Sequence, residues 1–302
     1  MIELWVPITI AAAFCQNVRS ALQKHLTGRL TTLGAAYVQF LYAWPFAVIY
    51  LAALNVWGGM ALPEPNGVFF IYAVLGGLSQ IIFTGLLMWL FTYRNFAVGT
   101  TYSKTEVIFV ALLGFLILGD TVTIIAAIAI VVAAIGVMAL SVRQGEITVA
   151  VLLAGLVEKP ALIGFASGVF LGASVVFFRG AALVLGYDGA IMAAAYTLAV
   201  SVVLQTLMMG AYLAVREPAT LRAVFVQWRW ALPVGIAGML ASACWFTAFT
   251  MQNAAYVRAL GQIELVFTFA ASVFFFREKT NRTEVAGIAL VIAAIVILIL
   301  WG

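Results

Sequence analysis

Charged residues are scarce in this chain: they make up 9% of its 302 residues, whereas apolar residues make up 66%. Soluble domains usually contain about 25% charged residues and about half apolar residues. The composition therefore excludes an ordinary soluble domain and predicts a protein that crosses a membrane several times.

Histidine and cysteine are also scarce, with one histidine and two cysteines in the chain. His25 stands alone, whereas a membrane enzyme is expected to cluster His, Asp or Cys side chains at one membrane face. Cys15 and Cys244 both fall inside apolar runs and so belong to no disulfide framework. We therefore expect no enzymatic activity, no metal site and no cofactor.

Long apolar runs fill the chain instead. A run of about 20 residues is long enough to cross the bilayer as a helix. The first run has only Glu3 ahead of it and lacks the basic start of a signal peptide, so we interpret it as a retained helix. The expected fold is all-α and integral to the membrane, with ten transmembrane helices near residues 4–26, 32–54, 67–92, 97–119, 122–141, 161–185, 188–215, 230–251, 255–276 and 283–301.

The basic residues between these runs indicate an orientation. All of them follow odd-numbered runs: Lys24, Arg29, Arg94, Arg143, Lys159, Arg216, Arg222, Arg229, Arg277, Lys279 and Arg282. By the positive-inside rule those loops are cytoplasmic, and both termini are non-cytoplasmic. We expect a multi-pass protein of the cell's inner (cytoplasmic) membrane. The net charge of +4 then reflects topology, and no nucleic-acid partner is expected.

An internal repeat organises the sequence. Residues 91–123 resemble residues 249–281 at a shift of 158 positions, which aligns Glu106 with Glu264 and Asp120 with Glu278. Five helices separate the copies and five is odd, so the second half enters the membrane upside down. We expect a first five-helix repeat at 1–141, a cytoplasmic interfacial linker at 142–160 and an inverted second repeat at 161–302. Residues 216–230 are expected to form a second surface segment.

The repeated glutamates are the main candidate site residues. Each lies 14 residues before the acidic end of its helix, which is about 21 Å of helical rise. Both carboxylates are therefore expected near mid-membrane, where an acidic residue costs roughly 2.5 to 3.5 kcal/mol and marks a functional site. Lys104 points to a different side of the helix from Glu106, so the partner expected for Glu106 is Arg19, Arg179 or the substrate.

Further residues complete this predicted site. Lys104 and Gln262 occupy equivalent positions of the two copies, and Tyr102 lies one turn before Glu106. Arg19 and Arg179 are expected as pocket cations, and the alternative for Arg19 is an anchor that snorkels to the cytoplasmic membrane surface. The full set predicted for substrate binding or coupling is Glu106, Glu264, Lys104, Gln262, Arg19, Arg179 and Tyr102.

Other patterns predict packing rather than chemistry. Trp44-Pro45 predicts a kink in the second helix. Glycines at residues 164, 168 and 172 form a ridge that lets another backbone approach closely. Asn95 and Asn253 are expected to cap the helices that follow them. The fifth helix, which has no charged residue, and the tenth, which has only Glu284 at its start, are expected at the rim or against lipid.

The residues at the ends of the repeated helices resemble the drug/metabolite transporter superfamily in its EamA-like form. The fourth helix ends in Gly119-Asp120 and the ninth in Phe276-Arg277-Glu278, where that family has a Gly-Glu-like pair. Glu264 matches the family's mid-helix glutamate, although Leu265 and Val107 stand where proline is usual. The resemblance covers nearly the whole chain. It implies export or exchange of small metabolites such as amino acids, through a pocket among helices 1 to 4 and 6 to 9.

The resulting hypothesis is a secondary transporter that exports or exchanges a small metabolite by alternating access, coupled to protons. An anionic metabolite is an alternative, because four basic residues lie in or near the spans: Arg19, Lys104, Arg179 and Arg258. A second alternative is a non-transporting scaffold or receptor. The expected partners are the substrate, protons and the lipid bilayer, and the protein itself is expected to be monomeric or dimeric.

Overall fold

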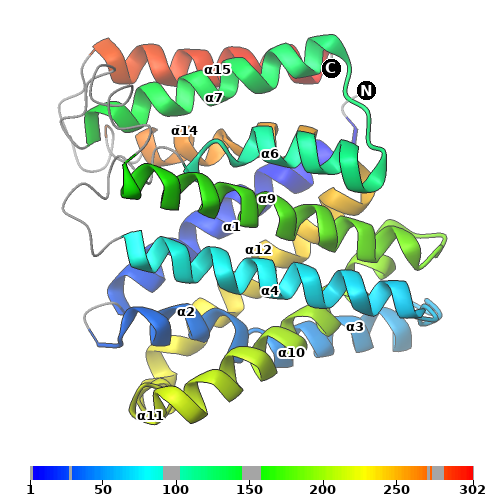
Figure 1. Ribbon diagram of the computed structural model, residues 1–302. Coiled ribbons are helices and arrows are strands. Elements are labelled where there is room, and N and C mark those ends of the chain that lie inside the picture. Colours follow the sequence, from blue (N-terminus) through cyan, green and yellow to red (C-terminus); the bar gives the residue numbers. More distant parts are fainter. Residues whose placement is uncertain are drawn as a thin grey trace. The chain divides into compact units, whose positions relative to one another are not determined.

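The computed structural model describes residues 3–26, 29–90, 103–144, 158–270, 273 and 282–301, and every regular element among them is helical (Figure 1). Two compact units can be distinguished. Unit 1 comprises Met1–Ile81 and Phe177–Gln252, and unit 2 comprises Ile82–Val176 and Asn253–Gly302. Each unit therefore combines segments from both halves of the sequence.

Unit 1 contains α1 (Trp5–Leu26), α2 (Thr32–Leu41), α3 (Trp44–Val56), α10 (Ala190–Arg216), α11 (Pro218–Val226) and α12 (Trp228–Met251). Unit 2 contains α6 (Glu106–Leu113), the π-helix η1 (Gly114–Leu118), α7 (Ile124–Gln144), α13 (Ala254–Gly261), α14 (Ile263–Ala270) and α15 (Arg282–Trp301). Two more helices, α4 (Gly67–Leu90) and α9 (Lys159–Val184), contribute residues to both units.

Five of the described helical stretches are long and apolar enough to cross a membrane: Thr32–Val56, Gly67–Leu87, Lys159–Val184, Ala190–Arg216 and Trp228–Met251. Shorter apolar helices cover Glu106–Leu118, Ile124–Met138 and Val285–Trp301. An all-helical membrane architecture is thus confirmed, while the count of ten spans stays a prediction. Most of the predicted linker, at residues 145–157, lies outside the described residues.

The kink predicted at Trp44-Pro45 is present as a break between α2 and α3. Tyr42 and Ala43 form a turn, and Pro45 lies in the first turn of α3, where its missing N–H costs no hydrogen bond. A Cβ built at Gly235 of α12 would lie only 2.6 Å from the backbone carbonyl of Tyr42. Glycine at that position therefore allows α12 to pack directly against the break.

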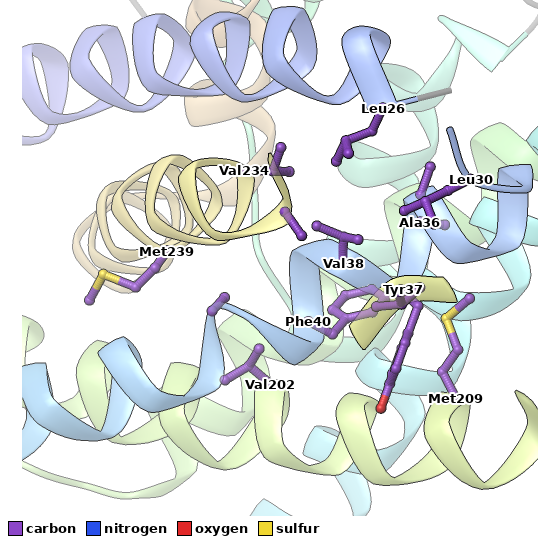
Figure 2. Packing of buried hydrophobic residues seen from close by; sticks show 14 of the residues in the cluster. Leu26, Leu30, Ala36, Tyr37, Val38, Phe40, Val202, Met209, Val234 and Met239 are labelled. Atoms are coloured by element: carbon purple, nitrogen blue, oxygen red, sulfur yellow. The ribbon is translucent and has the colours of Figure 1, made fainter. Parts of the chain in front are cut away.

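The apolar core of unit 1 forms around α2. Tyr37, Val38 and Phe40 are 3%, 0% and 4% exposed, and α10 and α12 contribute buried residues such as Met209 and Val234. Figure 2 shows Tyr37 extending toward α10 beside Met209, where its hydroxyl donates to the carbonyl of Thr206 at 3.2 Å. The polar end of this buried side chain is thus satisfied.

The segment between the seventh and eighth predicted spans lies at the surface, as expected for residues 216–230: all of them except Thr220 and Val224 are exposed or half-buried. Pro218–Val226 forms the short helix α11, which the core of unit 1 holds in place. Val224 is fully buried, and its carbonyl accepts a hydrogen bond from the Tyr42 hydroxyl at 3.1 Å. Phe225 and Val226, in the last turn of α11, remain exposed.

In unit 2, α7 and α15, which correspond to the fifth and tenth predicted helices, pair with each other. Figure 1 shows α7 and α15 side by side, and a Cβ at Gly136 would lie 2.9 Å from the carbonyl of Gly287. The other face of α7 leaves Ile124, Ile128 and Ile135 between 53% and 80% exposed. Their helical spacing makes a stripe suited to lipid, in line with the predicted rim position.

The predicted glycine ridge on α9 packs against the segment that carries the first repeated glutamate. A Cβ at Gly168 would lie 3.1 Å from the carbonyl of Ser103, and one at Gly172 would lie 3.2 Å from the backbone nitrogen of Val110. The close approach predicted from the glycine spacing is therefore confirmed. It fixes α6 against the unit 2 part of α9.

Candidate functional site

Turns stand at equivalent positions of the two copies of the repeat, although neither copy has a proline there. Lys104 and Thr105 form a turn directly before α6, and Gln262 forms a turn between α13 and α14. The continuous helix expected at 255–276 is therefore wrong at Gln262, and the helix expected at 97–119 is wrong at Lys104 and Thr105. Glu106 directly follows its turn and Glu264 comes two residues after Gln262, so each lies in the first turn of a helix, where the helix dipole favours a negative charge.

The carboxylate of Glu106 forms a buried ion pair with Arg258 of α13. The guanidinium Nη2 donates to Oε1 of Glu106, and the two side chains are 9% and 3% exposed. The expectation that Glu106 pairs with Arg19 or Arg179 was therefore wrong.

Glu264 forms a looser ion pair with Lys104. The distance from Nζ of Lys104 to Oε1 of Glu264 is 3.5 Å, and the two side chains are 34% and 13% exposed. That distance exceeds the usual range of an N–H···O hydrogen bond, about 2.7 to 3.2 Å. The pair thus joins the turn before α6 to α14 mainly through Coulomb attraction.

The four charges form one neutral cluster within unit 2. Arg258 also interacts electrostatically with Glu264, so positive and negative groups alternate in the order Lys104, Glu264, Arg258, Glu106. Gln262 is 1% exposed and its amide donates to the carbonyl of Arg258 at 3.3 Å. Gln262 therefore hydrogen-bonds the backbone of α13, whereas Lys104, at the equivalent position of the first copy, belongs to the charged cluster.

Asn253 caps α13, as predicted. Its side-chain oxygen accepts from the N–H of Ala255 at 2.9 Å, and its amide nitrogen donates to the carbonyl of Thr121 at 3.1 Å. These two bonds fix the start of the helix that carries Arg258. The equivalent Asn95 lies outside the described residues.

Arg179 has a different role from the pocket cation predicted for it. Its guanidinium donates to the carbonyl of Phe249 and, at 2.5 Å, to the carbonyl of Gln252. These carbonyls lie at the C-terminal end of α12, where a positive charge satisfies backbone acceptors and complements the helix dipole. Arg179 is therefore best explained as a helix cap within unit 1.

Arg19 lines a polar pocket within unit 1. The empty volume among the lining side chains is about 430 Å³, including the part that opens to the surface, and a water-sized sphere's centre can occupy about 30 Å³ of it. Five different helices supply the polar lining: Arg19, Gln39, Gln80, Gln205 and Ser242. The amide of Gln205 donates to Oε1 of Gln80 at 2.5 Å, which links α10 to α4.

The structure thus changes the predicted set of site residues. Lys104, Glu106, Glu264 and Gln262 come together in unit 2, Arg19 lines the unit 1 pocket, and Tyr102 lies outside the described residues. Arg258 was missing from that set. Its signal was available, since it is a basic residue inside an apolar run, but its partner lies 152 residues away and follows from the fold alone.

Comparison with known proteins places the chain in a family. A family model described as the EamA-like transporter family matches residues 3–142 and 158–300. The chain belongs to the EamA-like transporter family. As a member, it is a multi-pass membrane protein that transports small molecules, and the EamA-like family is typically non-enzymatic.

A solved structure shares the fold of this EamA-like chain. It is named "Crystal structure of protein" and is 15% identical to this chain in sequence. The match covers 100% of each of the two chains, with a TM-score of 0.73. At that identity the likeness concerns the fold alone. No curated protein matches the sequence.

Proposed function

We propose that this chain is a secondary transporter that exports or exchanges a small metabolite with an amino group, such as an amino acid, by alternating access coupled to protons. The observation that supports this most directly is the loose ion pair between Lys104 and Glu264. It is partly open, it contains a carboxylate, and its residues lie in the turn before α6 and just after the turn that separates α13 from α14. Discontinuous helices of this kind form the substrate and ion sites of many transporters.

Glu264 is the carboxylate that proton and substrate share in this proposal. A substrate ammonium takes the place of the Lys104 ammonium beside Glu264, because both are cations of similar size. A proton on Glu264 removes the negative charge that attracts either cation. Proton and substrate therefore compete, and a transporter that carries one in each direction is an antiporter.

The second ion pair has a structural role in the same proposal. Arg258 and Glu106 are buried from solvent and pack α13 against α6. Removing either charge from its partner is costly inside a protein, so this pair stays closed while the Lys104–Glu264 pair opens. The two repeated glutamates thus have different roles: Glu106 holds α6 and α13 together, and Glu264 binds the substrate and the proton in turn.

An anionic substrate is a second candidate, because the cations of the cluster, Lys104 and Arg258, both face carboxylates. A substrate anion would then displace Glu264 from Lys104. Protonation of Glu264 would favour this displacement, so proton and substrate would bind together. The two candidates therefore predict opposite effects of acid on substrate binding.

Counterflow in proteoliposomes tests the proposal. The purified protein is loaded with members of a panel of amino acids, amines and carboxylates, and exchange is followed with and without a pH gradient. We expect exchange of an amino compound that an opposing proton gradient accelerates in the wild type and not in Glu264→Gln. Normal, equally pH-dependent exchange by Glu264→Gln would refute the coupling role, and acid-enhanced carboxylate uptake would favour the anionic candidate. No exchange of any compound would favour a scaffold or receptor.

The proposal includes location and orientation. The basic loops support insertion in the cell's inner membrane with both termini on the non-cytoplasmic side. A C-terminal reporter that is active only in the cytoplasm should be silent, and an active reporter would reverse the orientation.

A further inference from the structure

We infer that the pocket of unit 1 is a binding subsite for the carboxylate group of a small, partly apolar metabolite, with Arg19 as the group that binds it. This deepens the proposed transport function, on which it rests, by naming a substrate class. It concerns unit 1 by itself and uses none of the residues of the charged cluster.

The charge of the pocket points to an anion. Of the described lining residues, Arg19 is the one charged side chain, and the remaining polar ones are three glutamines and a serine. A guanidinium offers paired N–H donors in the plane of a carboxylate. A single positive charge suits a monovalent carboxylate better than a doubly charged phosphate.

The Arg19 side chain is held in position by the helix it packs on. A Cβ built at Gly238 of α12 would lie 3.2 Å from Cδ of Arg19, so the stem of Arg19 lies against the α12 backbone. Gly77 of α4 leaves similar room for Gln205, whose Cγ would lie 3.2 Å from a Cβ there. Two polar lining residues are thus packed over glycines. Positioning of this kind lowers the entropy lost on binding.

The rest of the lining points to an apolar part of the ligand. Phe40, Leu198, Val202 and Met239 are at most 7% exposed and line the pocket together with Phe246. Figure 2 shows Phe40, Val202 and Met239 on three different helices. The space open to a water-sized centre, about 30 Å³, holds a few waters or one small polar group. The carboxylate replaces these waters, and the apolar lining adjusts around the remainder of the ligand.

Ligand-induced thermal stabilisation in nanodiscs tests this inference with defined probes. Acetate, butanoate and 4-methylpentanoate are compared with 4-methylpentanamide, which has the same shape as the last acid but no charge. We expect 4-methylpentanoate to stabilise the wild type most, acetate less and the amide not at all. Equal effects of acid and amide, or no effect of any acid, would overturn the inference.

Variants assign the effect to the pocket. Arg19→Gln should weaken carboxylate binding by about tenfold to a hundredfold, the usual loss for a charged hydrogen-bond partner. Arg29→Gln is the matched control, because Arg29 belongs to unit 1 but stacks on Trp230 at 4.5 Å and is not among the lining residues. If Arg19→Gln proves too unstable to measure, Arg19→Lys keeps the charge and should bind more weakly than the wild type. Unchanged carboxylate binding in the Arg19 variants would contradict the assignment.

Different results would refute the coupling role of Glu264 and the carboxylate subsite at Arg19. Glu264→Gln should retain carboxylate binding in the pocket while losing proton-coupled exchange. Normal coupled exchange by Glu264→Gln with binding that still depends on Arg19 would refute the coupling role alone. Exchange that depends on Glu264 but shows no preference for carboxylates would refute only the assignment of the unit 1 pocket as a carboxylate subsite.

Discussion

The two copies of the repeat place the same residue, glutamate, in two different environments. Glu106 and Arg258 form a buried ion pair, here called the sealed pair, with side chains 3% and 9% exposed. Glu264 and Lys104 form a partly exposed ion pair, here called the open pair, at 3.5 Å and with side chains 13% and 34% exposed. In both pairs the acid comes from one copy and the base from the other. Sequence symmetry therefore does not imply equal function: burial and the distance to the partner decide which carboxylate is free to exchange ligands.

Breaking the sealed pair should have the largest effect on stability. Arg258→Met leaves Glu106 buried without its closest counter-charge, which typically costs about 3 to 5 kcal/mol. Lys104→Met breaks the open pair and should cost at most about 1 kcal/mol, because water stabilises the exposed charge that remains. Thermal unfolding of both variants in nanodiscs measures the difference. Similar losses for the two variants would remove the distinction between the pairs.

Overpacking the glycine ridge should have an intermediate effect. Gly172→Val places a side chain within about 3.2 Å of Cβ of Phe109 and the nitrogen of Val110, so α6 must shift and Glu106 with it. We expect a loss of about 1 to 3 kcal/mol in the free energy of unfolding. Gly85→Ala is the control, because a Cβ there meets nothing within 4 Å. A neutral result for Gly172→Val would mean that α9 does not fix this segment.

Making the two copies alike at the open pair should have the smallest effect on stability. Lys104→Gln introduces the residue that the second copy has at position 262 and should change stability by at most about 1 kcal/mol. The KM for an amino substrate should fall, by up to about tenfold, because Lys104 no longer competes for Glu264. A KM that rises, or exchange that is lost, would instead favour an anionic substrate held by Lys104. Lys104→Arg, which keeps the charge, should resemble the wild type.

Periodic features of the structure followed from the sequence. The kink at Pro45, the glycine ridge on α9 and the Asn253 cap depend on local chemistry or on a spacing along one helix, and all three were predicted correctly. The equivalence of Glu106 and Glu264 was likewise visible as a repeat. Such features need no knowledge of which helices are neighbours.

Contacts between residues that are distant in sequence could not be predicted from the sequence. Glu106 and Arg258 are 152 residues apart, and no pattern on either helix shows that they meet. The pocket of unit 1 combines residues from α1, α2, α4, α10 and α12, so its lining depends on the packing of five helices. The two turns were missed for another reason: the expected signal was proline, and the turns occur at Lys104 and Gln262 without it.

The most direct test of the division between the pairs is counterflow by two variants prepared in parallel. Glu106→Leu combined with Arg258→Met replaces the sealed pair with apolar side chains, which is often neutral or stabilising when both charges are removed. Glu264→Gln removes only the exchangeable carboxylate. We predict that the double variant still exchanges the substrate with proton coupling and that Glu264→Gln does not. A folded double variant without exchange, beside a Glu264→Gln variant with normal coupling, would contradict the account.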